Sequence, residues 1–141
     1  MNIIVIFDKA LSYRIFQCEL KNNLTLNLYD ESIKMIGDRW LLTLVARMTI
    51  PVADDLIQED HLDLMDKNEI KKTLGESVVF EQKSNRIFVD QSDKKNIFQE
   101  MYDIFLENTL PYLSHRDFPK RFLLKKIKEE VKKRLKPPHN H

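Results

Sequence analysis

Apolar and polar residues alternate along several stretches of this chain, and the longest of them is RWLLTLVARMTIPV, residues 39–52. This period of two predicts a β-strand with one buried face. The buried face would carry Trp40, Leu42, Leu44, Ala46, Met48 and Ile50. The other face mixes Leu41 and Val45 with Thr43, Arg47 and Thr49. If no helix of the chain covers Leu41 and Val45, we expect a second subunit to contact them.

Two shorter alternating stretches, residues 12–20 and 24–29, precede this strand. The segment between them, 21–23, contains two asparagines, which tolerate positive φ and favour a turn. The pattern therefore predicts a β-hairpin, whose second strand can extend toward Met35. Because Gly37 marks another turn, residues 11–52 predict a three-stranded antiparallel meander. Residues 2–7 predict a further short strand.

The pattern changes after Pro51. Residues 53–74 predict a helix, in one or two pieces, with Asp54 or Asp55 as its N-cap and Gly75 as its C-cap. Residues 77–81 and 86–90 then alternate again, which predicts a second hairpin with its turn at 83–85.

Two helices are predicted in the last third of the chain. Ser92 is expected to cap a helix to about Leu110, because its apolar residues recur at three-four spacing. The second helix is expected to start at Ser114 or Asp117 and to run to about Leu135. Strands thus come first and helices later, which predicts a single α+β domain over 1–136. Its antiparallel sheet of five or six strands would be packed by the C-terminal helices, and 137–141 would form a disordered tail.

Composition indicates a globular protein, with 43% hydrophobic and 32% charged residues among 141. The single cysteine, Cys18, excludes an internal disulfide and predicts a cytoplasmic location. The first apolar run, residues 3–7, is too short for a signal peptide or a membrane span. The net charge of +1 conceals a basic C-terminal part, since residues 113–141 contain ten Lys and Arg but three Asp and Glu. This asymmetry predicts an acidic partner for the basic part.

Common catalytic and cofactor motifs are absent. With two glycines in the chain, neither G-x-x-x-x-G-K-[ST] nor G-x-G-x-x-G nor G-x-S-x-G can be formed. The spacing of Cys and His fits no common metal site, so we predict no cofactor and no metal. Cys18 could act as a nucleophile with His61 or His115, but buried unreactive cysteine is the commoner interpretation. No small-molecule substrate is inferred.

An acidic segment spans residues 54–69, where seven carboxylates accompany one lysine. On a helix, Asp55, Glu59, Asp63 and Asp66 would lie along one stripe. A solvated helix face is the simplest interpretation, and an interaction surface is the alternative.

The basic C-terminal helix offers a complementary stripe, here called the basic ridge, formed by Arg121, Lys125, Lys128 and Lys132. It lies beside an apolar stripe formed by Leu123, Leu124, Ile127, Val131 and Leu135. The ridge could complement the helix's own dipole, bind an acidic protein surface, bind nucleic-acid phosphates or lie on an anionic membrane. A whole-chain pI of 7.8 argues against a dedicated nucleic-acid domain.

These observations predict a small cytoplasmic interaction protein without catalytic activity, either a homo-oligomer or a subunit bound to a protein partner. Its interaction surface would comprise the basic ridge and the four acidic residues. A nucleic-acid-binding regulator that uses the basic ridge is the alternative. An enzyme would require a pocket in which His61 or His115 lies beside carboxylates.

Overall fold

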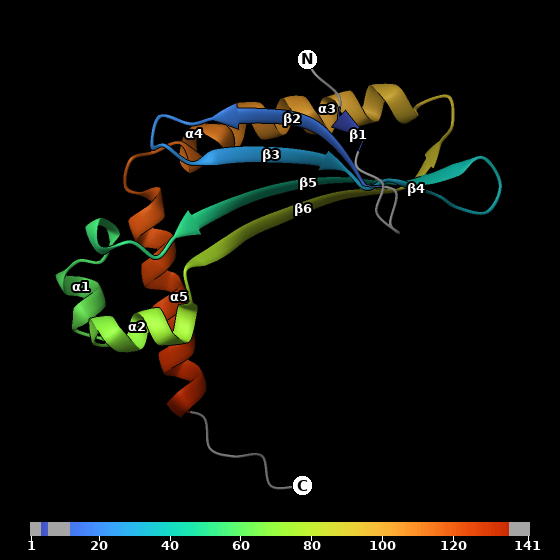
Figure 1. Cartoon of the computed structure of the whole chain (residues 1–141). Coiled ribbons are helices and arrows are strands. Elements are labelled where there is room, and N and C mark those ends of the chain that lie inside the picture. Colours follow the sequence, from blue (N-terminus) through green and yellow to red (C-terminus); the bar gives the residue numbers. More distant parts are fainter. Residues whose placement is uncertain (1–3, 6–11, 136–141) are drawn as a thin grey trace, which may run out of the picture. The chain divides into compact units, whose positions relative to one another are not determined.

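The computed structural model describes residues 4–5 and 12–135, and these residues form two compact units (Figure 1). The sheet unit contains the described residues up to Met48 together with Phe80–His115. The helical unit contains Thr49–Val79 together with the described residues from Arg116 onward. The expectation that 1–136 is a single domain stays a prediction. The expected tail at 137–141, with His139 and His141, lies outside the described residues.

The sheet is antiparallel, as predicted, and has the order β1-β2-β3-β5-β4, with β6 paired to β5. Its strands are β1 (Ile4–Val5), β2 (Tyr13–Glu19), β3 (Thr25–Asp30), β4 (Ile33–Lys34), β5 (Arg39–Pro51) and β6 (Ser77–Asp90). The short β4 continues β3 along the same side of β5, because Asp30 faces Leu44 and Ile33 faces Leu41. The α+β class and the meander are therefore confirmed.

Turns in the meander occur where positive φ is accessible. Asn23 has φ 68° between β2 and β3, and Gly37 has φ 72° before β5. The side chain of Asn22 donates to the carbonyls of Leu113 and His115, at 2.8 and 3.0 Å. The first turn is thereby held against the end of α4 (Leu110–Leu113).

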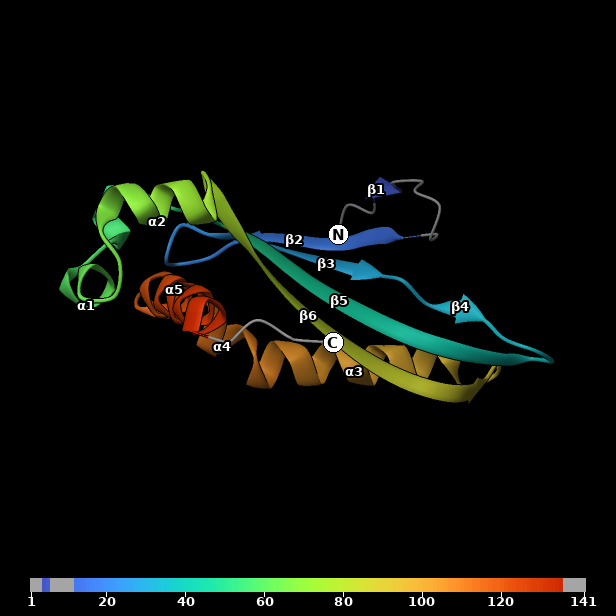
Figure 2. The same cartoon turned by 90° about the horizontal axis from the view of Figure 1, so that it is seen from below.

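One face of the sheet unit is covered by α3 (Lys94–Asn108), which runs along the strands in both views (Figure 1, Figure 2). Met101 and Phe105 of α3 are buried, and the ring of Tyr102 packs edge-on against Phe16 at a centroid distance of 6.1 Å. The strands contribute Leu26, Leu28, Leu42, Leu44 and Ala46 to the same core. The predicted buried face of β5 is confirmed.

The opposite face of β5, whose cover the sequence left open, is also largely buried. Val45 is 0% exposed, and Thr43 is buried. Val45 faces Tyr29 on β3, and the guanidinium of Arg47 lies 4.9 Å from the centroid of the Tyr29 ring. Long polar side chains can cover apolar surface while their charged ends stay in water. Val45 is therefore covered by side chains of its own sheet rather than by a helix, and it leaves no surface for a second subunit. Leu41 is half-buried.

The predicted second hairpin is wrong, because residues 77–90 form one continuous strand, β6. The segment Lys83-Ser84-Asn85 contains neither glycine nor proline, so nothing forces a turn. Pairing with a strand as long as β5 stabilises the extended state instead. The side-chain contacts of Thr43 with Asn85 and of Arg47 with Glu81 show that β6 runs antiparallel to β5.

The helical unit contains the acidic segment and the basic helix. Its elements are the 3₁₀-helix η1 (Asp54–Leu56), α1 (Glu59–Leu62), α2 (Lys67–Leu74) and α5 (Phe118–Leu135). Helix α5 contacts η1, α1 and α2. Ile70 of α2 and both Leu123 and Ile127 of α5 are 0% exposed, so apolar burial holds these helices together. The described part of the predicted C-terminal helix is helical from Phe118 to Leu135.

Several predicted helix starts are wrong by one residue or more. Residues 53–74 form three short helices rather than one or two, and η1 is capped by Ala53 instead of Asp54 or Asp55. Asp93, not Ser92, precedes α3, and its side chain makes no cap hydrogen bond. Gly75 does end α2, with φ 78°.

Candidate functional site

The basic ridge is exposed along α5, since Arg121, Lys125, Lys128 and Lys132 all project to solvent. Arg121 lies 3.8 Å from Asp117 in the preceding turn. Within residues 12–135, the other three cations have no ion-pair partner. The ridge therefore retains most of its charge for an external anion.

Three other cations on α5 are paired within the chain. Lys126 lies 3.6 Å from Glu129, and Lys133 lies 3.1 Å from Glu130. Arg134 pairs with Glu69 of α2 and donates to the hydroxyl of Thr73 at 3.1 Å. The acidic segment and the basic helix thus do pair within one chain, but through residues outside the predicted surface.

The four acidic candidates are exposed but do not share one helix. Asp55 lies in η1, Glu59 begins α1, Asp63 follows α1, and Asp66 caps α2 by accepting from the N–H of Glu69 at 2.9 Å. The single stripe expected from helical periodicity is therefore broken into three short elements. In the described part of the chain, Asp55, Glu59 and Asp63 form no ion pair.

Their neighbour Asp54 is different, because Lys67 and Lys71 lie 3.0 and 2.5 Å from its carboxylate. The hydrogen bond from Lys71 is the main cause that lowers the pKa of Asp54 below its ordinary value, and the hydrogen bond from Lys67 adds to it. Asp54 thereby joins η1 to α2, while the three exposed carboxylates remain accessible to a partner.

His61 is buried and has a structural role. Its Nδ1 accepts from the backbone N–H of Gln58 at 2.9 Å, so Nε2 carries the ring hydrogen and donates to the carbonyl of Lys120 at 2.9 Å. The ring thus closes the first turn of α1 and attaches α1 to α5. With both nitrogens engaged, His61 is unavailable as a general base.

A polar cluster centred on Arg47 lies on the face of the sheet opposite α3. The sequence patterns did not indicate it. The Nε of Arg47 donates to Glu81 at 2.6 Å and its Nη2 donates to Glu31 at 3.1 Å. The bond from Arg47 lowers the pKa of Glu81, and the same bond is the main cause that raises the pKa of Arg47. A carboxylate held ionised in this way is a poor proton donor near neutral pH. The cluster therefore stabilises the sheet.

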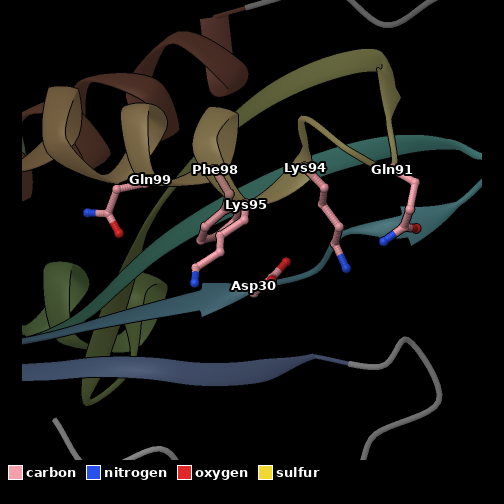
Figure 3. Close-up of a pocket in the computed structure, with 6 residues that line it drawn as sticks. All are labelled: Asp30, Gln91, Lys94, Lys95, Phe98 and Gln99. Carbon is pink, nitrogen blue, oxygen red and sulfur yellow. The ribbon is translucent and has the colours of Figure 1, made fainter.

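A pocket of about 340 Å³ lies between α3 and the end of β3 (Figure 3). It is lined by Asp30, Gln91, Lys94, Lys95, Phe98 and Gln99. The ammonium of Lys94 lies 3.5 Å from the centroid of the Trp40 ring, and Gln91 accepts from the indole N–H of Trp40. Lys95 extends from α3 toward β3, and Asp30 lies at the end of β3 (Figure 3). The lining thus holds one carboxylate and two ammonium groups, and it indicates no particular ligand.

Two further pockets carry no catalytic arrangement. One of about 250 Å³ lies between β6 and α3, beside Gln82 and Met101, and one of about 580 Å³ lies beside Glu69 and Arg134. Neither His61 nor His115 lines any of these three pockets. Among the described residues, no group of three His, Cys, Asp or Glu side chains is placed to hold a metal ion.

The half-buried Cys18 directs its thiol to the carbonyl of Glu19 at 3.4 Å. In the part of the chain that the structure covers, every helix is too short or too polar to cross a membrane. Comparison of the chain with protein-family models, curated proteins and solved structures gives no match. The structure therefore shows an α+β protein. Its helical unit presents a row of unpaired cations on one side of α5.

Proposed function

We propose that this protein is a non-catalytic interaction module whose basic ridge binds an acidic surface of a partner protein. The observation that carries the proposal is the sorting of charge on α5. Lys125, Lys128 and Lys132 have no ion-pair partner among the described residues, whereas three cations on other sides of the helix, Lys126, Lys133 and Arg134, are paired. We also infer a cytoplasmic location, because the chain contains a single cysteine.

Exposed cations in a row favour association in two ways. They raise the encounter rate with an acidic surface, and they select against basic ones. The buried stripe on the neighbouring face of α5, with Leu123 and Ile127, fixes the helix in place. The ridge is therefore presented on a rigid support, so that little conformational entropy is lost on binding.

A nucleic-acid-binding regulator is the second candidate, because the same unpaired lysines could contact phosphates. Two features make it the weaker one. The chain as a whole has a pI of 7.8. After the buried Phe122, the ridge also has no interleaved aromatic side chains, which would provide a stacking platform for bases.

A titration with three probes separates these candidates. The first probe is a helical peptide with glutamates at the ridge spacing of four, three and four residues. The second is a peptide of the same composition with its glutamates scattered, and the third is a duplex DNA of about 20 base pairs. Binding is followed by fluorescence anisotropy in about 50 and 200 mM salt, since screening weakens exposed charge pairs.

Two double variants supply the matched controls. K125Q/K128Q removes two unpaired ridge cations, whereas K126Q/K133Q removes two cations that are already paired with Glu129 and Glu130. We expect the spaced peptide to bind best, with an affinity that falls about tenfold in K125Q/K128Q and less than twofold in K126Q/K133Q.

Two outcomes would contradict the proposal. Tighter binding of the DNA than of the spaced peptide, with the same dependence on Lys125 and Lys128, would establish the nucleic-acid regulator instead. No binding of any probe in the low-salt buffer would refute both candidates.

A further inference from the structure

The outer edge of β6 is a second candidate interaction surface, independent of the basic ridge. β5 is the one described strand that pairs with β6. A long unpaired edge is a template for another strand, and natural proteins usually shorten, cover or interrupt it. β6 extends over 14 residues, and the stretch between Glu81 and Ile87 contains neither proline nor glycine.

The backbone groups that point outward can be identified. The carbonyl of Thr43 accepts from the N–H of Glu31, so the backbone of Thr43 is directed toward the β3 side of β5. Thr43 lies opposite Asn85, because their side chains are 2.8 Å apart. This position is therefore a non-hydrogen-bonded pair, and the N–H and C=O of Asn85 point away from β5. By alternation, the same holds for Glu81, Lys83 and Ile87.

This regular edge ends at Phe88, which has φ 56°. Beyond it, the N–H of Gln91 donates to the carbonyl of Asp38 at 2.8 Å, and Arg39 pairs with Asp90. These contacts lie one residue further along β6 than the Thr43–Asn85 pair would place them. One extra residue in a strand is a β-bulge, which reverses the direction of the backbone groups that follow it.

We propose that a second copy of this chain adds to the outer edge of β6, antiparallel, with the two-fold axis at Ser84. A two-fold axis perpendicular to a sheet pairs a residue with its own copy. Ser84 is the midpoint of the outward-pointing residues, so this register pairs Lys83 with Asn85 and Glu81 with Ile87 of the other copy. All their outward groups are then satisfied, by about eight backbone hydrogen bonds.

The side chains are compatible with this register. No like charges lie directly opposite, because Lys83 faces an amide and Glu81 faces an aliphatic side chain. Ile87, which is 61% exposed in the single chain, is covered by the stem of Glu81 of the other copy. At the axis the two small serine side chains meet, at the position where Cα atoms approach most closely.

Proline at position 83 tests the edge directly. Because the N–H of Lys83 points outward, Lys83→Pro removes a donor that the sheet of the single chain does not use. Wild type is expected to be dimeric at micromolar concentration by light scattering, and Lys83→Pro is expected to be monomeric with an unchanged circular dichroism spectrum. The control Lys83→Gln removes only the charge and should remain dimeric. A monomeric wild type, or a dimeric Lys83→Pro that is folded, would refute the proposal.

Cysteine cross-linking tests the register without a risk of misfolding, in a Cys18→Ser background. Cα atoms of a non-hydrogen-bonded pair lie about 4.5 Å apart, within the range that a disulfide spans. Ser84→Cys should therefore form a covalent dimer on mild oxidation. Gln82→Cys should not, because this register separates its two copies by about 13 Å. Equal cross-linking of both variants, or none in Ser84→Cys, would exclude this arrangement.

Discussion

The buried His61 makes the sharpest stability prediction in the helical unit. Its ring joins two backbone groups that lie far apart in sequence, the N–H of Gln58 and the carbonyl of Lys120. His61→Ala removes both bonds and leaves two polar groups beside a space that the ring had filled. Glutamine and asparagine each replace half of the ring, because the amide nitrogen of Gln can reach the position of Nε2 and the oxygen of Asn that of Nδ1.

The magnitude follows from the two hydrogen bonds. His61 is 3% exposed, so solvent does not readily replace either partner. A hydrogen bond contributes about 0.5–1.5 kcal/mol, and a buried group left unsatisfied costs about 1–3 kcal/mol. We therefore expect His61→Ala to lower the free energy of unfolding by about 2–4 kcal/mol. His61→Gln, which keeps the bond to Lys120, and His61→Asn, which keeps the bond to Gln58, should each lose about half as much.

Urea denaturation followed by circular dichroism measures these differences. With a slope of about 2 kcal/mol per molar urea, the middle of the usual range for small proteins, His61→Ala should shift the midpoint by about 1–2 M. A loss below about 0.5 kcal/mol in His61→Ala would show that the two bonds contribute little. Equal losses in all three variants would contradict the assignment of one bond to each ring nitrogen.

Three further predictions concern other contacts. Because Arg47 lowers the pKa of Glu81 below its ordinary 4.5, this pair stabilises the fold above that pH, and its contribution is lost as the pH falls through the lowered pKa. Glu81→Gln should thus be less stable than wild type at pH 7, and the difference should shrink as the pH is lowered below 4.5, in urea melts at each pH. Asn22→Ala should cost about 1–2 kcal/mol in the same assay, since it removes the bonds to the carbonyls of Leu113 and His115. Gly75→Ala should cost about 1–3 kcal/mol, because the backbone there has φ 78° and ψ −157°, and an equal stability would show that the turn relaxes freely.

The local sequence pattern was sufficient to predict those elements whose conformation depends mainly on their own residues. The alternation around Leu42 and Leu44, the positive φ at Asn23 and the end of α2 at Gly75 were all predictable. The same pattern gave the wrong prediction where pairing with a distant strand determines the conformation. Nothing within 83–85 shows that β5 is long enough to hold those residues in an extended strand, so a hairpin was the natural but wrong inference. The acidic segment was likewise divided by packing of Met65 and Ile70, which periodicity alone does not register.

The candidate surface was predictable only in part, for a related reason. Helical spacing is enough to align Lys125, Lys128 and Lys132 on one side of α5. Whether a cation is already neutralised depends on residues that pack from elsewhere, as Glu69 does on Arg134. His61 shows the same limit, because its partner at Lys120 lies 59 residues away. Sequence spacing therefore identified the ridge and the neighbouring carboxylates of Lys126 and Lys133, whereas the structure was needed to show that Glu69 pairs with Arg134.

The continuity of β6 also changes where self-association is expected. A hairpin over 77–90 would have paired its two halves with each other and left a short edge. One continuous strand leaves the backbone groups of Glu81, Lys83, Asn85 and Ile87 directed outward. Meanwhile Val45, where a second subunit was first expected, is covered by side chains of its own sheet. The surface that favours a second copy is therefore a backbone edge, and substitutions on the polar face such as Arg47→Met should leave the dimer intact.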